Sequence, residues 1–123
     1  MYAAAGGTGV GVYQAAKDAG KFAIGVDSNQ NYLHPGTMLT SMLKRVDVAA
    51  YNVFMDAKND KFTPGIQVLG LAEDGVGWAL DEHNESIITG EMKAKLDELS
   101  EMIKSGDITV HDYTSDNDCK VAG

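Results

Sequence analysis

The sequence predicts an α/β fold, a small parallel-type sheet flanked by helices. Short apolar runs alternate with segments of helical periodicity along the 123 residues. A glycine cluster at residues 6–9 separates the first apolar run from the first helical segment, and Asp27 closes the next apolar run. Strand, glycine turn, helix and strand in this order form a βαβ unit, whose strands are parallel. The length suits one domain.

The first elements follow from short patterns. Residues 3–5 form an apolar run that stops at glycine and predict the end of a strand. Residues 10–19 carry apolar side chains at helical spacing, and Gly20 is expected to follow the helix as its C′ residue. Residues 21–26 are a short apolar strand, and residues 28–36 are a loop.

The middle of the chain repeats the alternation. Residues 38–43 predict a third strand, and Asp47 is a plausible N-cap for a helix that ends at Lys58. Within that helix Ala50, Val53, Phe54 and Ala57 form an apolar stripe.

The last third contains one strand and one helix by the same criteria. Residues 66–71 predict a fourth strand, and residues 73–84 are irregular. Thr89 is expected to cap a helix over residues 91–103, in which Met92, Leu96, Leu99 and Ile103 recur at amphipathic spacing. After Gly106 the sequence is polar.

Charge and composition exclude several classes of partner. The chain has 10 basic and 18 acidic residues, which gives a net charge of −8. This charge disfavours both nucleic acid and an anionic membrane surface as partners. The single cysteine, Cys119, allows no intrachain disulfide. No apolar run approaches the ~20 residues of a transmembrane helix. Residues 1–5 have no basic segment and no long apolar segment, so we expect no signal peptide or lipobox in this chain.

The glycine cluster is the first candidate site. It does not fit the G-x-G-x-x-G dinucleotide fingerprint, because the third position is Val12 or Gln14, and no P-loop lysine follows. What remains is a glycine turn whose backbone N–H groups face a ligand, or a tight turn without one.

Asp27 and Lys44 are the second and third candidates. Asp27 stands at a strand end 20 residues after Gly7, where a carboxylate suits the vicinal hydroxyls of a ribose; a loop or cap aspartate is the alternative. Lys44 stands near the same sheet edge, where it is able to pair with Asp27 and bond a sugar hydroxyl. A solvated lysine is the favoured alternative on spacing alone.

No other chemistry is indicated. The sequence contains no pattern that combines a nucleophile with a general base, and no Gly-x-Ser-x-Gly elbow of a serine hydrolase. We therefore expect no catalysis. The calcium-loop pattern that begins at Asp27 breaks at Tyr32 and Met38. The three histidines share no ligand spacing, so we expect neither a metal nor a cofactor.

Four motifs in fixed order resemble the basic membrane protein family of substrate-binding lipoproteins, which includes bacterial purine nucleoside receptors. They are residues 3–9, 23–30, 39–49 and 75–77. The resemblance implies a partial C-terminal lobe of a type I periplasmic binding protein over residues 1–112, followed by a polar tail at 113–123. The resemblance also implies a function: the protein captures a nucleoside for an ABC importer, and a purine nucleoside is the expected ligand.

The resemblance also implies roles for single residues. The family's glycine turn matches Gly6 and Gly7, whose backbone lines the cleft near the sugar. Its strand-end aspartate matches Asp27, which accepts the ribose hydroxyls. Its lysine matches Lys44, which bonds the same sugar. The residues of the family that stack on the base and read its edge lie mainly upstream of the matched region.

The partial match carries further expectations. The full-length parent is expected to be lipid-anchored at the cell surface or in the periplasm and to deliver ligand to an ABC permease. A partial lobe exposes apolar surface and strand edges, which favour a homodimer or a domain-swapped oligomer. Two alternatives stay open: a Rossmann-like nucleotide-cofactor domain of an enzyme, and a folded oligomer without a ligand of its own.

Overall fold

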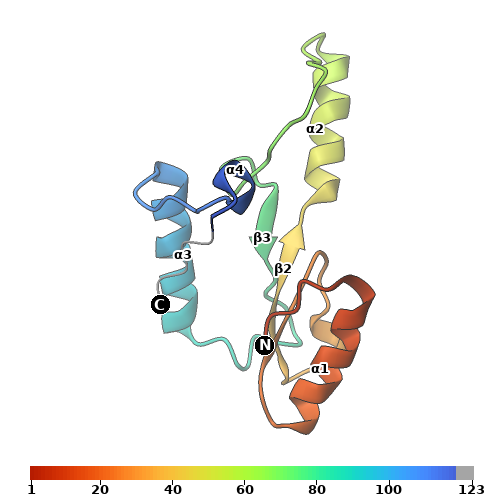
Figure 1. Ribbon diagram of the computed structural model, residues 1–123, viewed down its shortest axis with the longest axis vertical. Helices are drawn as coiled ribbons and strands as arrows, with labels where there is room; N and C mark the ends of the chain where they lie inside the picture. The colour runs from red at the N-terminus through yellow and green to blue at the C-terminus, as the bar shows by residue number, and fades with distance from the viewer. Residues whose placement is uncertain (119–123) are drawn as a thin grey trace.

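A three-stranded sheet forms the centre of the molecule. The computed structural model describes residues 1–118, with strands β1 (Ala23–Gly25), β2 (Met38–Lys44) and β3 (Val76–Trp78) in the order β1-β2-β3 (Figure 1). β1 and β2 are parallel, whereas β2 and β3 are antiparallel. The predicted α/β class is confirmed, and the parallel arrangement holds for the first pair of strands.

Helix α1 (Gly9–Asp18) covers one face of this sheet. Tyr13 and Ala16, one turn apart, are buried against Ala23 of β1 and Met38 of β2. The helix ends at Asp18, and Gly20, with φ 62°, follows the C-cap Ala19 as the predicted C′ residue. The Gly20 N–H donates to Lys17 O and the Lys21 N–H to Ala16 O, the bond pattern of a Schellman motif.

The predicted opening strand at residues 3–5 is wrong. The parallel pairing at this point is an isolated bridge between Tyr2 and Ile24, supported by a 2.8 Å bond from Ile24 N–H to Met1 O. Residues 6–8 then form the short 3₁₀ helix η1 (Gly6–Thr8), in which Gly6 has φ 55°. The glycines turn the chain into α1 before a ladder with β1 is extended.

The predicted fourth strand at residues 66–71 is also wrong, and the strand lies instead in the segment read as irregular. β3 pairs Gly77 with Leu43 of β2. The Arg45 N–H donates to Gly75 O at 2.9 Å, which draws this glycine-rich segment against the end of β2. Any Cβ at Gly75 would lie 2.4 Å from the Leu69 Cβ, so only glycine fits there. With β1 on its other edge, β2 has no edge left for residues 66–71.

Helix α2 (Val46–Lys58) forms where the sequence predicts it but begins differently. Asp47 lies inside the helix, where its carboxylate accepts three hydrogen bonds from the Arg45 guanidinium, so it is not the N-cap. None of the α2 residues is buried. Figure 1 shows the helix extending away from the sheet, with the following chain returning alongside it toward β3.

Helix α3 (Gly90–Ser105) is capped as predicted, since the Thr89 side chain accepts from the Met92 N–H. Met92 and Leu96 face a cavity of about 320 Å³ that Ile24 and Leu39 of the sheet also line. The short helix α4 (Tyr113–Asp116) opens the predicted polar tail. Cys119 and the rest of that tail, to residue 123, lie outside the described residues. Among the described helices, none combines the length and apolarity needed to cross a membrane.

Candidate functional site

Asp27 and Lys44 meet at the carboxyl edge of the sheet. Asp27 follows β1 and Lys44 ends β2, and because these strands are parallel their ends lie side by side. The Lys44 Nζ lies 3.2 Å from Asp27 Oδ1, and the Lys44 N–H donates to Asp27 O at 2.8 Å. Both side chains are exposed, by 59% and 55%, so they form an ion pair with free surface for a ligand.

The backbone of Asp27 fixes the direction in which its side chain leaves the sheet. Its φ is 74°, in the left-handed region that aspartate tolerates better than most residues. The preceding residue is held by Gln30, whose Oε1 accepts from the Val26 N–H at 3.2 Å. A turn conformation and a side-chain bond therefore end β1 at the point where the carboxylate is presented.

The glycine turn leads into α1, and a hydrogen bond from this helix connects it to the loop that carries Asp27. The link runs through Tyr13, whose Oη donates to the same Gln30 Oε1 at 2.7 Å. Burial raises the pKa of this phenol above its ordinary value. A Cβ at Gly9 would lie 3.1 Å from Tyr13 Oη, so the start of α1 depends on glycine for this approach.

The structure therefore connects the four predicted residues in two ways. Asp27 and Lys44 contact each other directly. Gly6 and Gly7 are exposed in η1 and are positioned relative to that pair through α1 and Tyr13. The ion pair that the sequence suggested is present.

A groove begins next to the ion pair. Its volume is about 410 Å³, and Lys44 lines it together with Val46, Ala49, Gln67, Leu69 and Val76. Asp27, Gly6 and Gly7 are not part of its lining. The ion pair thus lies at a rim, open to solvent on the side of Asp27.

A polar network missed by the sequence analysis supports the Asp27 loop. It joins 3₁₀ helix η2 (Asn31–Leu33) to β2 and to the loop after β3. Ser41 Oγ accepts from the Gln30 N–H at 3.0 Å and donates to Asn31 Oδ1 at 2.8 Å. Asp81 Oδ2 accepts from the side-chain amides of Asn29 and Asn31. The Asn29 bond is the main cause that lowers the pKa of Asp81 below its ordinary value. These partners are 50 and 52 residues away from Asp81, so no local spacing reveals them.

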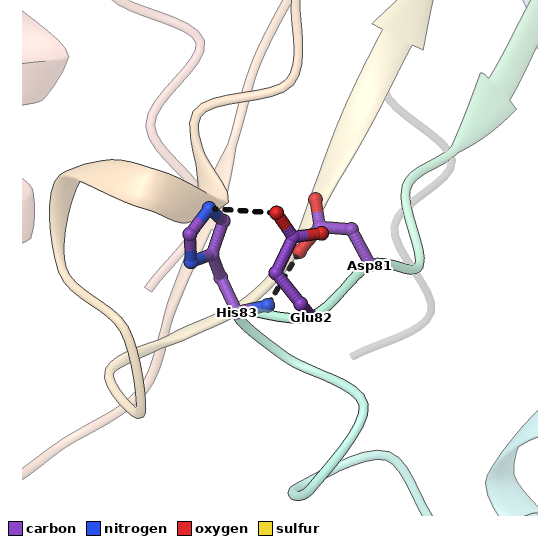
Figure 2. Close-up of side chains that lie close together, drawn as sticks. All are labelled: Asp81, Glu82 and His83. Atoms are coloured by element: carbon purple, nitrogen blue, oxygen red, sulfur yellow. Dashed lines mark hydrogen bonds and ion pairs between the residues drawn. The ribbon is translucent and has the colours of Figure 1, made fainter.

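Asp81, Glu82 and His83 form a cluster with the donor types that bind cations (Figure 2). Their ligand atoms lie within 4.8 Å of one another, and His83 Nε2 lies 3.7 Å from Glu82 Oε1. The Asp81 carboxylate is already occupied, since Oδ1 accepts from the His83 N–H and Oδ2 accepts from the two asparagines. Its evident task is to hold the loop that carries Asp27.

Known families and structures match most of this chain. A family model described as "ABC transporter substrate-binding protein PnrA-like" matches residues 1–114. Basic membrane protein D of Borreliella burgdorferi is 39% identical over 90 residues, which cover 70% of this chain and 26% of that protein. An uncharacterised lipoprotein of Pyrococcus horikoshii is 36% identical over 116 residues, covering 85% of this chain and 29% of that protein.

A solved structure shows the same arrangement. It is described as an ABC transporter solute-binding protein from Aeropyrum pernix, with 30% identity and a TM-score of 0.69. The match covers 93% of this chain and 41% of that chain. The present chain thus spans between about a quarter and two fifths of the length of the proteins that it matches.

Proposed function

This chain belongs to the family of PnrA-like ABC transporter substrate-binding proteins, and from that premise we propose that it carries the sugar-binding part of a nucleoside site. The longer protein would be the substrate-binding component of an ABC importer and would pass its ligand to a permease. Relatives named as lipoproteins and basic membrane proteins favour a lipid-anchored protein at the cell surface or in the periplasm. The family match favours this function over a Rossmann-like cofactor domain.

The observation that carries the proposal is the exposed pair of Asp27 and Lys44. A carboxylate accepts two hydrogen bonds from adjacent hydroxyls, which is the geometry of a ribose 2′,3′-diol. The ammonium group of Lys44, 3.2 Å from Asp27 Oδ1, has further protons to donate to a hydroxyl or ring oxygen.

The glycine turn completes the proposed sugar site. Gly6 and Gly7 have no side chains that a ligand must displace, and no heavy atom lies within 4 Å of a Cβ built at either residue. A ligand is therefore able to approach the backbone closely there. We propose a purine nucleoside as the ligand, held by its sugar between η1 and the ion pair.

Thermal unfolding with nucleosides tests this function. Inosine, guanosine or adenosine at ten times the dissociation constant stabilises a single site by about 1.4 kcal/mol. The 2′,3′-dideoxy analogues and the free bases are expected to stabilise much less, because they lack the diol. Asp27→Asn and Lys44→Gln are expected to reduce the nucleoside shift.

The matched control is Asp97→Asn, since Asp97 is also an exposed aspartate paired with a lysine, but on α3. It is expected to leave the shift unchanged. Equal stabilisation by nucleosides and free bases, or a shift that survives Asp27→Asn, would contradict the proposed sugar site.

A further inference from the structure

The side-chain amide of Gln30 connects the two halves of the proposed sugar site. Its Oε1 accepts from the Val26 N–H at 3.2 Å, next to Asp27, and from Tyr13 Oη at 2.7 Å. Tyr13 Oη lies close to the start of α1, since a Cβ at Gly9 would be 3.1 Å from it. The Gln30 amide therefore contacts the end of β1 directly and the start of α1 through Tyr13.

These hydrogen bonds determine which end of the Gln30 amide is the oxygen. A backbone N–H only donates, so the atom that accepts from Val26 is the carbonyl oxygen, and the NH2 group is the other end of the amide. The Gln30 N–H donates in turn to Ser41 Oγ at 3.0 Å, which holds the backbone of this residue. The amide thus has one orientation before any ligand binds, which lowers the entropy lost on binding.

The NH2 group of Gln30 has no protein acceptor. In the part of the chain that the structure describes, no protein atom accepts from Gln30 Nε2. Within those residues, every buried side-chain nitrogen or oxygen has a hydrogen-bond partner. An Nε2 without a partner is therefore accessible to solvent. Gln30 presents a fixed and unused donor three residues after Asp27.

A bound diol needs such a donor. Each hydroxyl of a ribose 2′,3′-diol has one proton and two lone pairs. When both protons are donated to the Asp27 carboxylate, both oxygens remain acceptors, and each loses hydrogen bonds to water as the ligand binds. The Lys44 ammonium, 3.2 Å from Asp27 Oδ1, is placed to donate to one of these oxygens. The other oxygen requires a second donor on the same side of Asp27 as the start of α1.

We propose that Gln30 contacts the ligand and that its Nε2 donates to the sugar hydroxyl oxygen that Lys44 does not bond. Asp27 then accepts from both hydroxyls, while Lys44 and Gln30 each donate to one. The site therefore rejects both the 2′-deoxy and the 3′-deoxy form of a nucleoside, because each leaves one donor of the site without its acceptor. This inference rests on the proposed sugar site and adds a specificity-determining residue to it.

The affinities of guanosine, 2′-deoxyguanosine and 3′-deoxyguanosine for the chain and for Gln30→Glu test this contact. The carboxylate of the variant keeps an acceptor for Val26 and Tyr13 but removes the NH2 donor. Guanosine is expected to bind the variant about tenfold more weakly. The deoxyguanosine that lacks the contacted hydroxyl is expected to lose no more than about twofold, because the contact is already absent. An equal loss for all three nucleosides would show that Gln30 does not touch the diol, and it overturns the proposal.

Gln14→Glu is the matched control. It makes the same substitution on the exposed side of α1, where Gln14 Nε2 donates to Asp18 Oδ1 at 2.8 Å. All three nucleosides are expected to bind this variant as they bind the unchanged chain.

The side-chain amide protons of Gln30 provide a readout in the unchanged chain, which does not depend on the folding of a variant. In an NMR titration, saturating guanosine is expected to shift the Nε2 proton signals of Gln30 and to leave those of Gln14 in place. Unshifted Gln30 signals in a chain that binds guanosine through its diol overturn the Gln30 contact alone. A chain that does not bind guanosine, or binds free guanine equally well, contradicts the proposed sugar site and this contact with it.

Discussion

At the scale of single residues, Asp81 holds the loop that presents Asp27. It accepts hydrogen bonds from the side chains of Asn29 and Asn31 and from the His83 N–H. Asn31 is fully buried, so its amide has no water to replace a lost acceptor. The site at the sheet edge therefore depends on a carboxylate that touches no part of the proposed ligand position.

Asp81→Ala is expected to destabilise the fold by about 1–3 kcal/mol, because it leaves a buried amide without its acceptor. Urea unfolding measures this loss. Glu82→Ala is the control, since Glu82 is exposed and adjacent, and it is expected to change stability by less than about 0.5 kcal/mol. Equal effects of the two substitutions would mean that Asp81 does not hold the loop.

Asp47 and Arg45 form a second residue-scale feature with a measurable signature. The hydrogen bond from Arg45 lowers the pKa of Asp47 to about 2. A lowered carboxyl pKa contributes stability above the ordinary value near ~3.9, and that contribution is lost as the pH falls through about 2. A carboxyl-detected NMR titration is expected to place the Asp47 midpoint near about 2, and Arg45→Gln is expected to return it toward ~3.9. A midpoint that does not move in Arg45→Gln would show that the guanidinium is not the cause.

At the scale of elements, local pattern predicted the helices better than the strands. The stripe and the Thr89 cap located α3, and Gly20 located the end of α1. Residues 66–71 have the apolar run of a strand, but both edges of the central strand β2 are taken by β1 and β3. β3 has only three residues and contains Gly77, so its pairing depends on backbone approach rather than on apolar pattern.

The site shows the same division. Asp27 and Lys44 were predictable, because parallel strands bring their carboxyl ends together. The supporting contacts among Asn31, Ser41 and Asp81 were not, since they join segments that are distant along the chain.

The close contact between β1 and β2 gives an element-scale prediction. A Cβ at Gly25 would lie 2.4 Å from Ser41 Oγ, so Gly25→Ala is expected to push β1 from β2 and to cost about 1–3 kcal/mol. Gly11 lies at an exposed position of α1, and a Cβ there would have no heavy atom within 4 Å. Gly11→Ala is therefore expected to stabilise the helix by up to about 1 kcal/mol. Thermal unfolding of both variants checks the opposite signs. A stable Gly25→Ala would show that the strands are less closely packed at this point.

At the scale of the whole molecule, the chain divides into a packed part and an extended part. Tyr13, Ala16, Ala23 and Met38 form the core beneath the sheet edge that carries Asp27 and Lys44. Helix α2 and the chain that returns from it, residues 46–69, extend from the same edge and expose apolar side chains. The proposed ligand site therefore belongs to the packed part of the chain.

The most direct test of the central claim is a two-dimensional amide NMR titration of the labelled chain with guanosine. The account predicts that the largest shift changes occur at Gly6, Gly7, Asp27 and Lys44, and that they are lost with 2′,3′-dideoxyguanosine. Amides of α3, such as Asp97, are expected to stay in place. Saturating guanosine that shifts none of the four amides, or that shifts only residues of α3, would contradict the assignment of the sugar site to this sheet edge.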